Sequence, residues 1–409
     1  MKNNQRPTLR FCKFSEDWEQ RKVITFSEET FGGGTPKTSV KEYWDGNIPW
    51  IQSSDLKEHN VAEVVVKKKI TENGLKNSAT KLIPGNSIAI VTRVGVGKIA
   101  LMQFEYSTSQ DFLSLSNLKV DEWFGVYSLY NQLQRELNNV QGTSIKGITK
   151  NELLDKEINI PVSLEEQNNI GKYFKQLDEI IILQQQELDA LKQTKQGFLQ
   201  KMFPKEGETV PELRFPEFVE DWKVETLNNV ANYRRGSFPQ PYGNKEWYDK
   251  EHGMPFVQVV DVDKNLKLVD NTKQKISKLA QPKSVYVEAG RVVVTLQGSI
   301  GRVAITQYPS YVDRTLLIFE NYKFPVDTFY FAYSIQLLFN REKTKAPGGT
   351  IKTITKEALS SFPIFLPNIE EQIQIGKFLK QLDDVIALQE QELDALKQTK
   401  QAFLQKMFV

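Results

Sequence analysis

The chain has 409 residues, of which 40% are hydrophobic and 25% charged. This composition is that of a globular protein rather than a disordered one, and since a single core seldom exceeds about 250–300 residues, the length favours two or three domains. The net charge of +2 neither requires nor excludes a polyanionic partner, so any basic surface must come from local clustering.

Cysteine and histidine are scarce in this sequence. The single cysteine, Cys12, excludes an intramolecular disulfide, and the two histidines, His59 and His252, stand in no metal-binding spacing. No apolar run approaches the roughly 20 residues that span a bilayer, and the first residues lack the apolar segment of a signal peptide. We therefore expect a cytoplasmic protein.

An internal duplication organises the whole chain. PTLRF at residues 7–11 returns as PELRF at residues 211–215, and IPWIQSSDL from Ile48 is answered by MPFVQVVDV from Met254. The matched stretches keep an offset of 203 to 206 residues up to the last segments, ELDALKQTKQGFLQKMF and ELDALKQTKQAFLQKMF. The pattern predicts two halves related by a pseudo-two-fold axis, with the two chain termini near each other.

Each half begins with strand-like segments and continues into helices. NSIAIVTRV at residues 86–94 and GRVVVTLQG at residues 290–298 predict strands that lead into glycine-containing turns. Helical patterns follow at residues 120–137 and 326–342. The expected fold class is α+β, with two pseudo-two-fold-related domains, at residues 1–162 and 213–367, joined by two long helices.

The long helices are predicted at residues 163–203 and 368–409, and a linker at residues 204–212 precedes the second domain. Ser163 with Glu166 and Asn368 with Glu371 have the spacing of capping boxes at the helix starts. Apolar residues then recur at alternating steps of three and four, as in a coiled coil. The predicted seam comprises Leu177, Ile181, Leu188, Leu191, Phe198, Leu382, Ile386, Leu393, Leu396 and Phe403.

We expect the two helices to pair with each other as an antiparallel coiled coil, because helices packed only on diverged domains would be free to diverge with them. In this interpretation Gln184 aligns with Gln389, and Lys195 aligns with Lys400. The alternative is a pair of surface helices, each packed on its own domain. A helix of roughly 40 residues would be a rod of about 60 Å that sets the distance between the two domains.

Taken together, these motifs closely resemble the specificity subunit of type I restriction-modification enzymes. The resemblance rests on the order and duplication of PELRFPEFVEDW, GGGTPKTSVKEYWDGNIPWIQSSDL, TRVGVGKIA, SIKGITKNELLDKEINIPVSLEEQ and FLQKMF, and it covers nearly the whole chain. It implies two target recognition domains, each reading one part of a bipartite asymmetric site in double-stranded DNA. It also implies that the helices dock two methyltransferase subunits, and that two translocase-endonuclease subunits join the complex when it restricts DNA.

The resemblance implies a non-catalytic subunit. The sequence has no D/N-P-P-Y/F methyltransferase motif, and Ile99 follows GVGK where a phosphate-binding loop needs Ser or Thr. We therefore expect no cofactor and no metal in this chain, and S-adenosylmethionine, ATP and Mg would be used by the partner subunits. A stand-alone DNA-binding regulator and a coiled-coil scaffold with two binding heads are the alternatives.

Three groups of side chains are candidates for DNA contact. The glycine turns carry the first group, which suits base edges in the major groove: Arg93, Lys98, Gln297, Ser299 and Arg302. The second group lies in SIKGITK and TIKTITK, for which a phosphate or structural role is favoured: Ser144, Lys146, Lys150, Thr350, Lys352 and Lys356. The third group follows predicted strands: Gln52, Ser53, Ser54 and Gln258. The alternatives are a solvated turn for the first group and strand-end hydrogen bonding for the third.

Overall fold

The computed structural model describes residues 6–139, 147–345 and 359–409. The chain forms two compact units: unit 1 comprises Met1–Gln186 with Glu392–Val409, and unit 2 comprises Glu187–Gln391. Each unit therefore contains one α+β domain and one half of each long helix. The unit boundaries fall inside the long helices, whereas the boundaries drawn from the sequence keep each helix whole.

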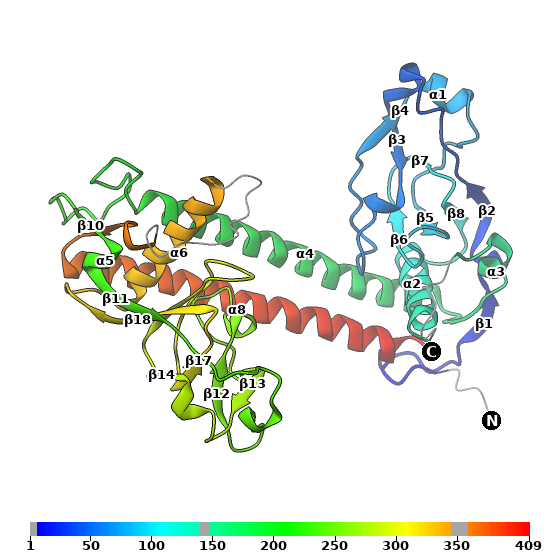
Figure 1. Ribbon diagram of the computed structural model, residues 1–409. Coiled ribbons are helices and arrows are strands. Elements are labelled where there is room, and N and C mark those ends of the chain that lie inside the picture. Colours follow the sequence, from blue (N-terminus) through cyan, green and yellow to red (C-terminus); the bar gives the residue numbers. More distant parts are fainter. Residues whose placement is uncertain (1–5, 140–146, 346–358) are drawn as a thin grey trace. The chain divides into compact units, whose positions relative to one another are not determined.

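The described part of unit 1 contains three sheets (Figure 1). The order β2-β8-β5-β6 is antiparallel, with β2 at Ser27–Gly32, β8 at Phe112–Leu118, β5 at Ser87–Val91 and β6 at Ile99–Met102. The order β4-β3-β7 contains β4 at Lys68–Ile70, β3 at Trp44–Ile51 and β7 at Ser107–Thr108, with β3 and β7 parallel. Finally, β1 at Glu19–Lys22 pairs with β9 at Glu157–Ile160.

Unit 2 repeats this plan. Its antiparallel sheet β11-β18-β15-β16 has β11 at Ala231–Arg235, β18 at Leu316–Tyr322, β15 at Val292–Thr295 and β16 at Val303–Ile305. The sheet β13-β12-β17-β14 has β13 at Gln274–Ile276, β12 at Met254–Val257, β17 at Ser310–Val312 and β14 at Val285–Val287. A third sheet pairs β10 at Lys223–Thr226 with β19 at Pro363–Leu366. The predicted strands at residues 86–94 and 290–298 are confirmed as β5 and β15.

One helix covers the main sheet of each domain: α2 (Glu122–Asn139) in unit 1 and α6 (Thr328–Lys345) in unit 2. These are the helices predicted at residues 120–137 and 326–342. Strand β5 is buried on both faces, because Ile88 and Ile90 join the core beside α2 while Ala89 and Val91 pack toward the second sheet. This double burial explains its unbroken apolar run. The short helices are α1 (Glu72–Lys76), α3 (Lys150–Leu154) and α5 (Leu227–Val230).

The long helices are α4 (Leu164–Lys201) and α8 (Ile369–Met407). As predicted, Ser163 and Asn368 cap their starts, by accepting hydrogen bonds from the main-chain N–H groups of Glu166 (3.4 Å) and Glu371 (2.9 Å). The two Glu side chains serve another purpose, because each accepts two hydrogen bonds from a half-buried arginine of the repeated LRF motif. These distances are 2.6 and 2.8 Å from Arg10 to Glu166, and 2.7 and 2.8 Å from Arg214 to Glu371.

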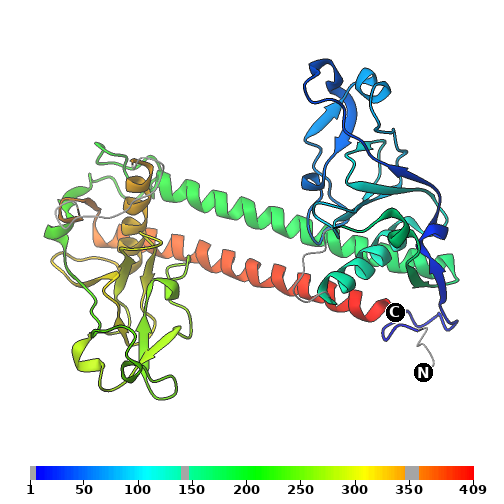
Figure 2. The same ribbon diagram turned by 45° about the vertical axis from the view of Figure 1, so that its right-hand side comes forward.

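The LRF motif also holds the end of a long helix. The N–H of Leu9 donates to the Lys406 carbonyl at the end of α8 (3.0 Å), and the N–H of Leu213 donates to the Lys201 carbonyl at the end of α4 (2.9 Å). Segments near the two chain ends therefore lie side by side in unit 1, as predicted (Figures 1 and 2). In unit 2 the linker at residues 204–212 joins the end of α4 to the second LRF motif along the chain.

Within each unit, the halves of α4 and α8 pack antiparallel. In unit 1, Leu404, Met407 and Phe408 of the α8 end enter the same core as Ile170 and Phe174 of α4. In unit 2, the corresponding residues Leu199, Met202 and Phe203 enter the core with Ile375 and Leu379. Each long helix thus starts on one domain and ends inside the core of the other, which corrects the alternative of surface helices packed on their own domains.

The structure places all ten predicted seam residues in buried or half-buried positions. The predicted alignment of polar residues is wrong. Lys195 forms an ion pair with Asp383 at 2.5 Å, and Lys400 forms one with Asp178. The side-chain oxygens of Gln184 and Gln389 are buried without a hydrogen-bond partner among the described residues.

None of the helices in the described part of the chain combines the length and apolarity needed to cross a membrane.

Two glycines of α4 provide a matched test of this packing. A Cβ on Gly171 would lie 2.6 Å from the main-chain nitrogen of Phe124, whereas a Cβ on Gly197 would meet nothing within 4 Å. We expect Gly171→Ala to lower the free energy of unfolding by about 1–3 kcal/mol through overpacking. Gly197→Ala should raise it by up to about 1 kcal/mol through helix propensity. Denaturant titrations of both variants check this, and similar effects of the two would contradict the close helix packing at Gly171.

Candidate nucleic-acid interface

The first candidate group in unit 1 sits in the turn between β5 and β6. The N–H of Val91 donates to the Lys98 carbonyl at 2.9 Å and closes the hairpin, with Arg93 exposed within the turn. Gly95 and Gly97 have φ values of 88° and 94°, and a Cβ on Gly97 would lie 2.3 Å from the Cδ1 of Leu137. Glycine is therefore required at this turn both by its backbone conformation and by its contact with α2.

The third candidate group lies beside this turn. Directly after β3, a 3₁₀ turn at Ser53–Asp55 is held by the buried carboxylate of Asp55, which accepts a hydrogen bond from the Gln52 N–H at 2.9 Å. The half-buried Lys98 reaches across and donates to the Ser53 carbonyl at 3.4 Å. Two groups that the sequence suggested separately therefore meet in one place, and we call residues 52–55 with residues 92–98 the first turn pair.

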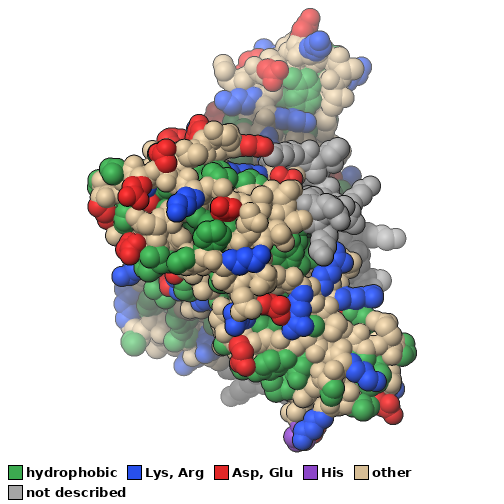
Figure 3. Space-filling view, turned by 60° about the vertical axis from the view of Figure 1, so that its left-hand side comes forward, with side chains coloured by type: hydrophobic (Ala, Val, Ile, Leu, Met, Phe, Trp, Pro, Cys, Tyr) green, Lys and Arg blue, Asp and Glu red, His purple; other side chains and the backbone are tan. Residues whose placement is uncertain are grey.

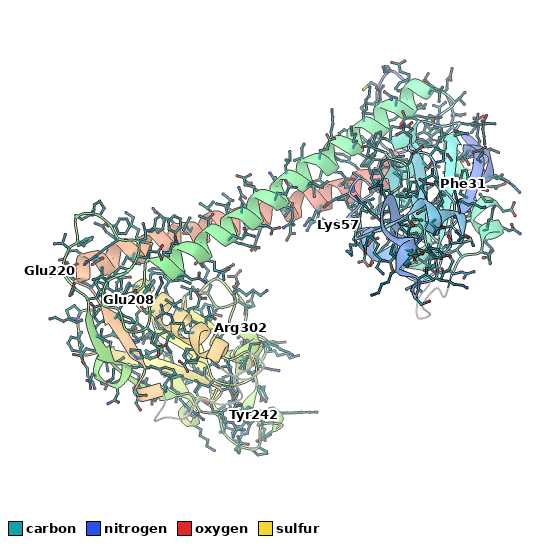
Figure 4. The ribbon with its side chains drawn as sticks, turned by 90° about the horizontal axis from the view of Figure 1, so that it is seen from above. Phe31, Lys57, Glu208, Glu220, Tyr242 and Arg302 are labelled. Atoms are coloured by element: carbon teal, nitrogen blue, oxygen red, sulfur yellow. The ribbon has the colours of Figure 1, made fainter. Side chains whose placement is uncertain are left out.

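Unit 2 contains the equivalent second turn pair, residues 258–261 with residues 296–302. The Asp261 carboxylate accepts hydrogen bonds from the N–H groups of Gln258 and Lys273, each at 2.8 Å. Burial raises the pKa of Asp261 although both hydrogen bonds oppose that shift. Arg302, labelled in Figure 4, donates to the Val262 carbonyl at 3.5 Å, and the hairpin presents Gln297 and Ser299 as exposed side chains.

Comparison of the two turn pairs distinguishes the framework residues, which close the turn and are the same in both units, from the exposed residues, which differ. QSSD in unit 1 corresponds to QVVD in unit 2, so only the residues that close the turn are kept. Asp55 and Asp261 were missed as site residues, although their retention in both halves was a readable indication. Val260 was missed too, and at 59% exposure it presents an apolar side chain where unit 1 has Ser54.

A cleft in unit 1 brings the first group together with part of the second. It has a volume of ≈ 430 Å³ and is lined by residues that include Arg93, Gln110 and Lys150. Lys150 donates a hydrogen bond to the Thr30 hydroxyl at 2.9 Å. The other members of the second group lie outside the described residues: Ser144, Lys146, Thr350, Lys352 and Lys356.

A basic run next to the first turn pair was also missed. Lys67, Lys68 and Lys69 are exposed, and Lys67 donates to the Ser54 carbonyl at 2.7 Å. Lys68 lies 5.7 Å from the ring centre of Trp44 and 5.8 Å from that of Trp50. Three consecutive lysines were visible in the sequence, but only the fold shows that they border the turn. On the face of unit 2 seen in Figure 3, Lys and Arg side chains lie among acidic and apolar ones.

Comparison with known families decides what this duplicated framework is. The family described as type I restriction modification DNA specificity domain matches residues 15–193 and again residues 219–398. The chain belongs to this family. Its two specificity domains are the two halves of the duplication, and each match contains one of the turn pairs.

Several known proteins are similar to the chain over most of its length. The putative type I restriction enzyme MjaX specificity subunit of Methanocaldococcus jannaschii is 23% identical and covers 95% of this chain and 92% of its own length. The MjaVIII specificity subunit of the same organism is 24% identical, with 95% and 91% covered. The crystal structure of a type I restriction-modification system S subunit from M. genitalium has the same fold, with a TM-score of 0.62 at 16% identity over 99% of both chains.

The framework role of Asp55 is testable by its removal. We expect Asp55→Ala to lower the free energy of unfolding of unit 1 by about 1–3 kcal/mol, because the Gln52 N–H loses its acceptor. Asp261→Ala should have the same effect in unit 2. Glu63→Ala, which breaks only the exposed ion pair with Lys57, is the matched control and should cost at most about 1 kcal/mol. Equal effects of Asp55→Ala and Glu63→Ala in denaturant titrations would contradict the framework role.

Proposed function

We propose that this chain is the DNA-reading subunit of a type I restriction-modification complex and that each specificity domain reads one part of a bipartite, asymmetric site. The observation that carries the proposal is that unit 2 contains a second turn pair equivalent to the first, in a chain with two specificity domains. The framework residues are the same in both pairs, whereas the exposed residues differ. Two readers built on one frame but with different exposed side chains are suited to two different sequences.

The exposed residues of the turn pairs suggest how the reading is divided. Arg93 and Lys150, which share the cleft of unit 1, suit a guanine edge and a backbone phosphate. In unit 2, Gln297 suits an adenine edge and the exposed Val260 suits a thymine methyl group. Lys98 and Arg302 are bonded to main-chain carbonyls, so we assign them mainly to holding each hairpin against its neighbouring turn.

Apolar side chains on the outer surfaces of the long helices support the proposed partners. Leu183 of α4 is 64% exposed and Leu388 of α8 is 56% exposed, each with a second exposed apolar residue three positions earlier. The two pairs occupy equivalent places in the duplication, so they suit two copies of one partner. We assign them to two methyltransferase subunits, which would use S-adenosylmethionine. Two translocase-endonuclease subunits, using ATP and Mg, would join in the restricting complex, and the assembly would act in the cytoplasm.

The test is DNA methylation by this chain together with the methyltransferase subunit encoded with it. We expect adenine methylation at a single bipartite motif, detected by sequencing DNA from cells that express both proteins. Exchange of residues 15–160 for those of another specificity domain should change one half of the motif and leave the other half as it was. Absence of methylation, or a change in both halves, would contradict the proposal.

The helix surfaces predict a change in stoichiometry. Leu183→Glu should remove one methyltransferase copy and the double variant with Leu388→Glu both copies, because an ion buried without a partner costs several kcal/mol. Native mass spectrometry counts the copies. Gln193→Glu with Gln398→Glu adds the same charges at other exposed, equivalent positions and should leave two copies bound. Two copies on the leucine double variant would show that this surface is not the docking site.

A further inference from the structure

The apolar seam of the long helices does not by itself choose one alignment. Its residues recur every seven positions, so a helix displaced by one heptad against its partner would again bury apolar side chains. Buried polar groups distinguish such alignments, because a displaced charge loses its partner. Among the described residues, the helix pair carries one charged triad in each unit, buried in unit 1 and with a half-buried lysine in unit 2.

The first triad joins three helices of unit 1. Asp178 of α4 and Lys400 of α8 are 2% and 6% exposed and form an ion pair. The hydroxyl of Tyr127 in α2 donates to the second oxygen of Asp178 at 2.6 Å. Lys400 also donates to the His59 carbonyl at 3.1 Å, four residues beyond the first turn pair. The triad therefore connects the alignment of the long helices to the placement of the specificity domain.

The second triad repeats this arrangement in unit 2 with the helices exchanged. Lys195 now comes from α4 and Asp383 from α8, at 2.5 Å. The Tyr333 hydroxyl of α6 donates to the other oxygen of Asp383 at 2.6 Å. The lysine lies over the tyrosine ring in both units, 5.6 Å from the ring centre in unit 1 and 5.3 Å in unit 2.

A displacement by one heptad leaves at least one lysine without a carboxylate. In one direction Lys400 would face Gly171 instead of Asp178, and Lys195 would face Gly376. At both glycines the N-terminal turn of a domain helix packs too closely for even a Cβ. In the other direction Lys195 would meet Glu390, but Lys400 would meet the uncharged amide of Gln185. Only the observed alignment pairs both lysines with carboxylates.

We infer that the two Tyr–Asp–Lys triads, together with the helix ends buried in the two domain cores, fix the alignment of the long helices and thereby the number of base pairs between the two halves of the DNA site. Their members are positioning residues, since none of them lies in a turn pair. One heptad is about 10 Å of helix. This displacement corresponds to about three base pairs of DNA. The consequence for DNA rests on the proposed function, whereas the consequence for helix alignment does not.

The test uses a full-length variant with both triads replaced by apolar residues of similar size. Replacing whole buried ion pairs in this way is often neutral for stability, so the variant should fold. Its substitutions are Asp178→Leu, Lys400→Met, Tyr127→Phe, Asp383→Leu, Lys195→Met and Tyr333→Phe. The matched control, Lys192→Met with Glu390→Leu, removes an exposed ion pair between the same helices.

Helix alignment is measured first, on the purified chain and without DNA. In a Cys12→Ser background, cysteines at positions 192 and 390 report the observed alignment through a short bismaleimide cross-linker. Cysteines at positions 192 and 397 report a displacement by one heptad. We expect only the first pair to cross-link with intact triads, and both pairs to cross-link in the apolar variant. Exclusive cross-linking of the first pair in the apolar variant would overturn the inference, whether or not the chain reads DNA.

The spacing of methylated sites is measured second, with the methyltransferase subunit. The unchanged chain and the matched control should methylate sites with one spacer, and the apolar variant should add spacers that differ by about three base pairs. If the apolar variant folds poorly, a second variant takes its place, with Asp178→Lys and Lys400→Asp as its only substitutions. It keeps a buried ion pair and should methylate sites with a single spacer. One unchanged spacer in the apolar variant would overturn the inference. Failure of the unchanged chain to methylate would overturn the proposed function instead.

Discussion

The burial of each long-helix end inside the opposite domain is the constraint on which the rest of the structure depends. Phe408, at the end of α8, lies among Phe124, Phe174 and Trp18 in unit 1. Phe203, just past α4, contacts Tyr330 and Trp222 in unit 2. Each aromatic side chain contributes about 1.5–3 kcal/mol by leaving water. A chain that closes both cores in this way must run its two helices antiparallel wherever they meet within a unit.

This constraint accounts for the uneven divergence of the two halves. Each helix end must match the core of the other domain, and the seam must match the other helix. The outer surface carries an exposed apolar pair at equivalent positions of both helices, so most positions of a long helix are restricted. The turn pairs are under weaker restriction. Asp55 and Asp261 hold their turns through the main chain, so the side chains at Ser54 and Val260 are free to differ without loss of the fold.

Sequence patterns predicted what is local and periodic, and they failed where two distant segments had to be matched. The strands followed from alternation, the seam from heptads, and the helix caps from the spacing of Ser163 and Asn368 before the helix starts. The alignment of Lys195 with Lys400 was wrong because a heptad pattern defines a helix face but not the offset of its partner. The capping role of Glu166 was wrong because its partner, Arg10, is 156 residues away. The meeting of Lys98 with Ser53, 45 residues apart, was equally beyond local patterns.

The two units differ in how soon they can be completed during synthesis. Unit 2 is one continuous stretch, Glu187–Gln391, but unit 1 needs Glu392–Val409 to close its core. At about 5–20 residues per second, the ribosome takes roughly 10–40 s to make the intervening segment. For that interval the apolar surface that will receive Phe408 stays uncovered on the nascent chain. The domain made first is therefore completed after the domain that follows it in the sequence.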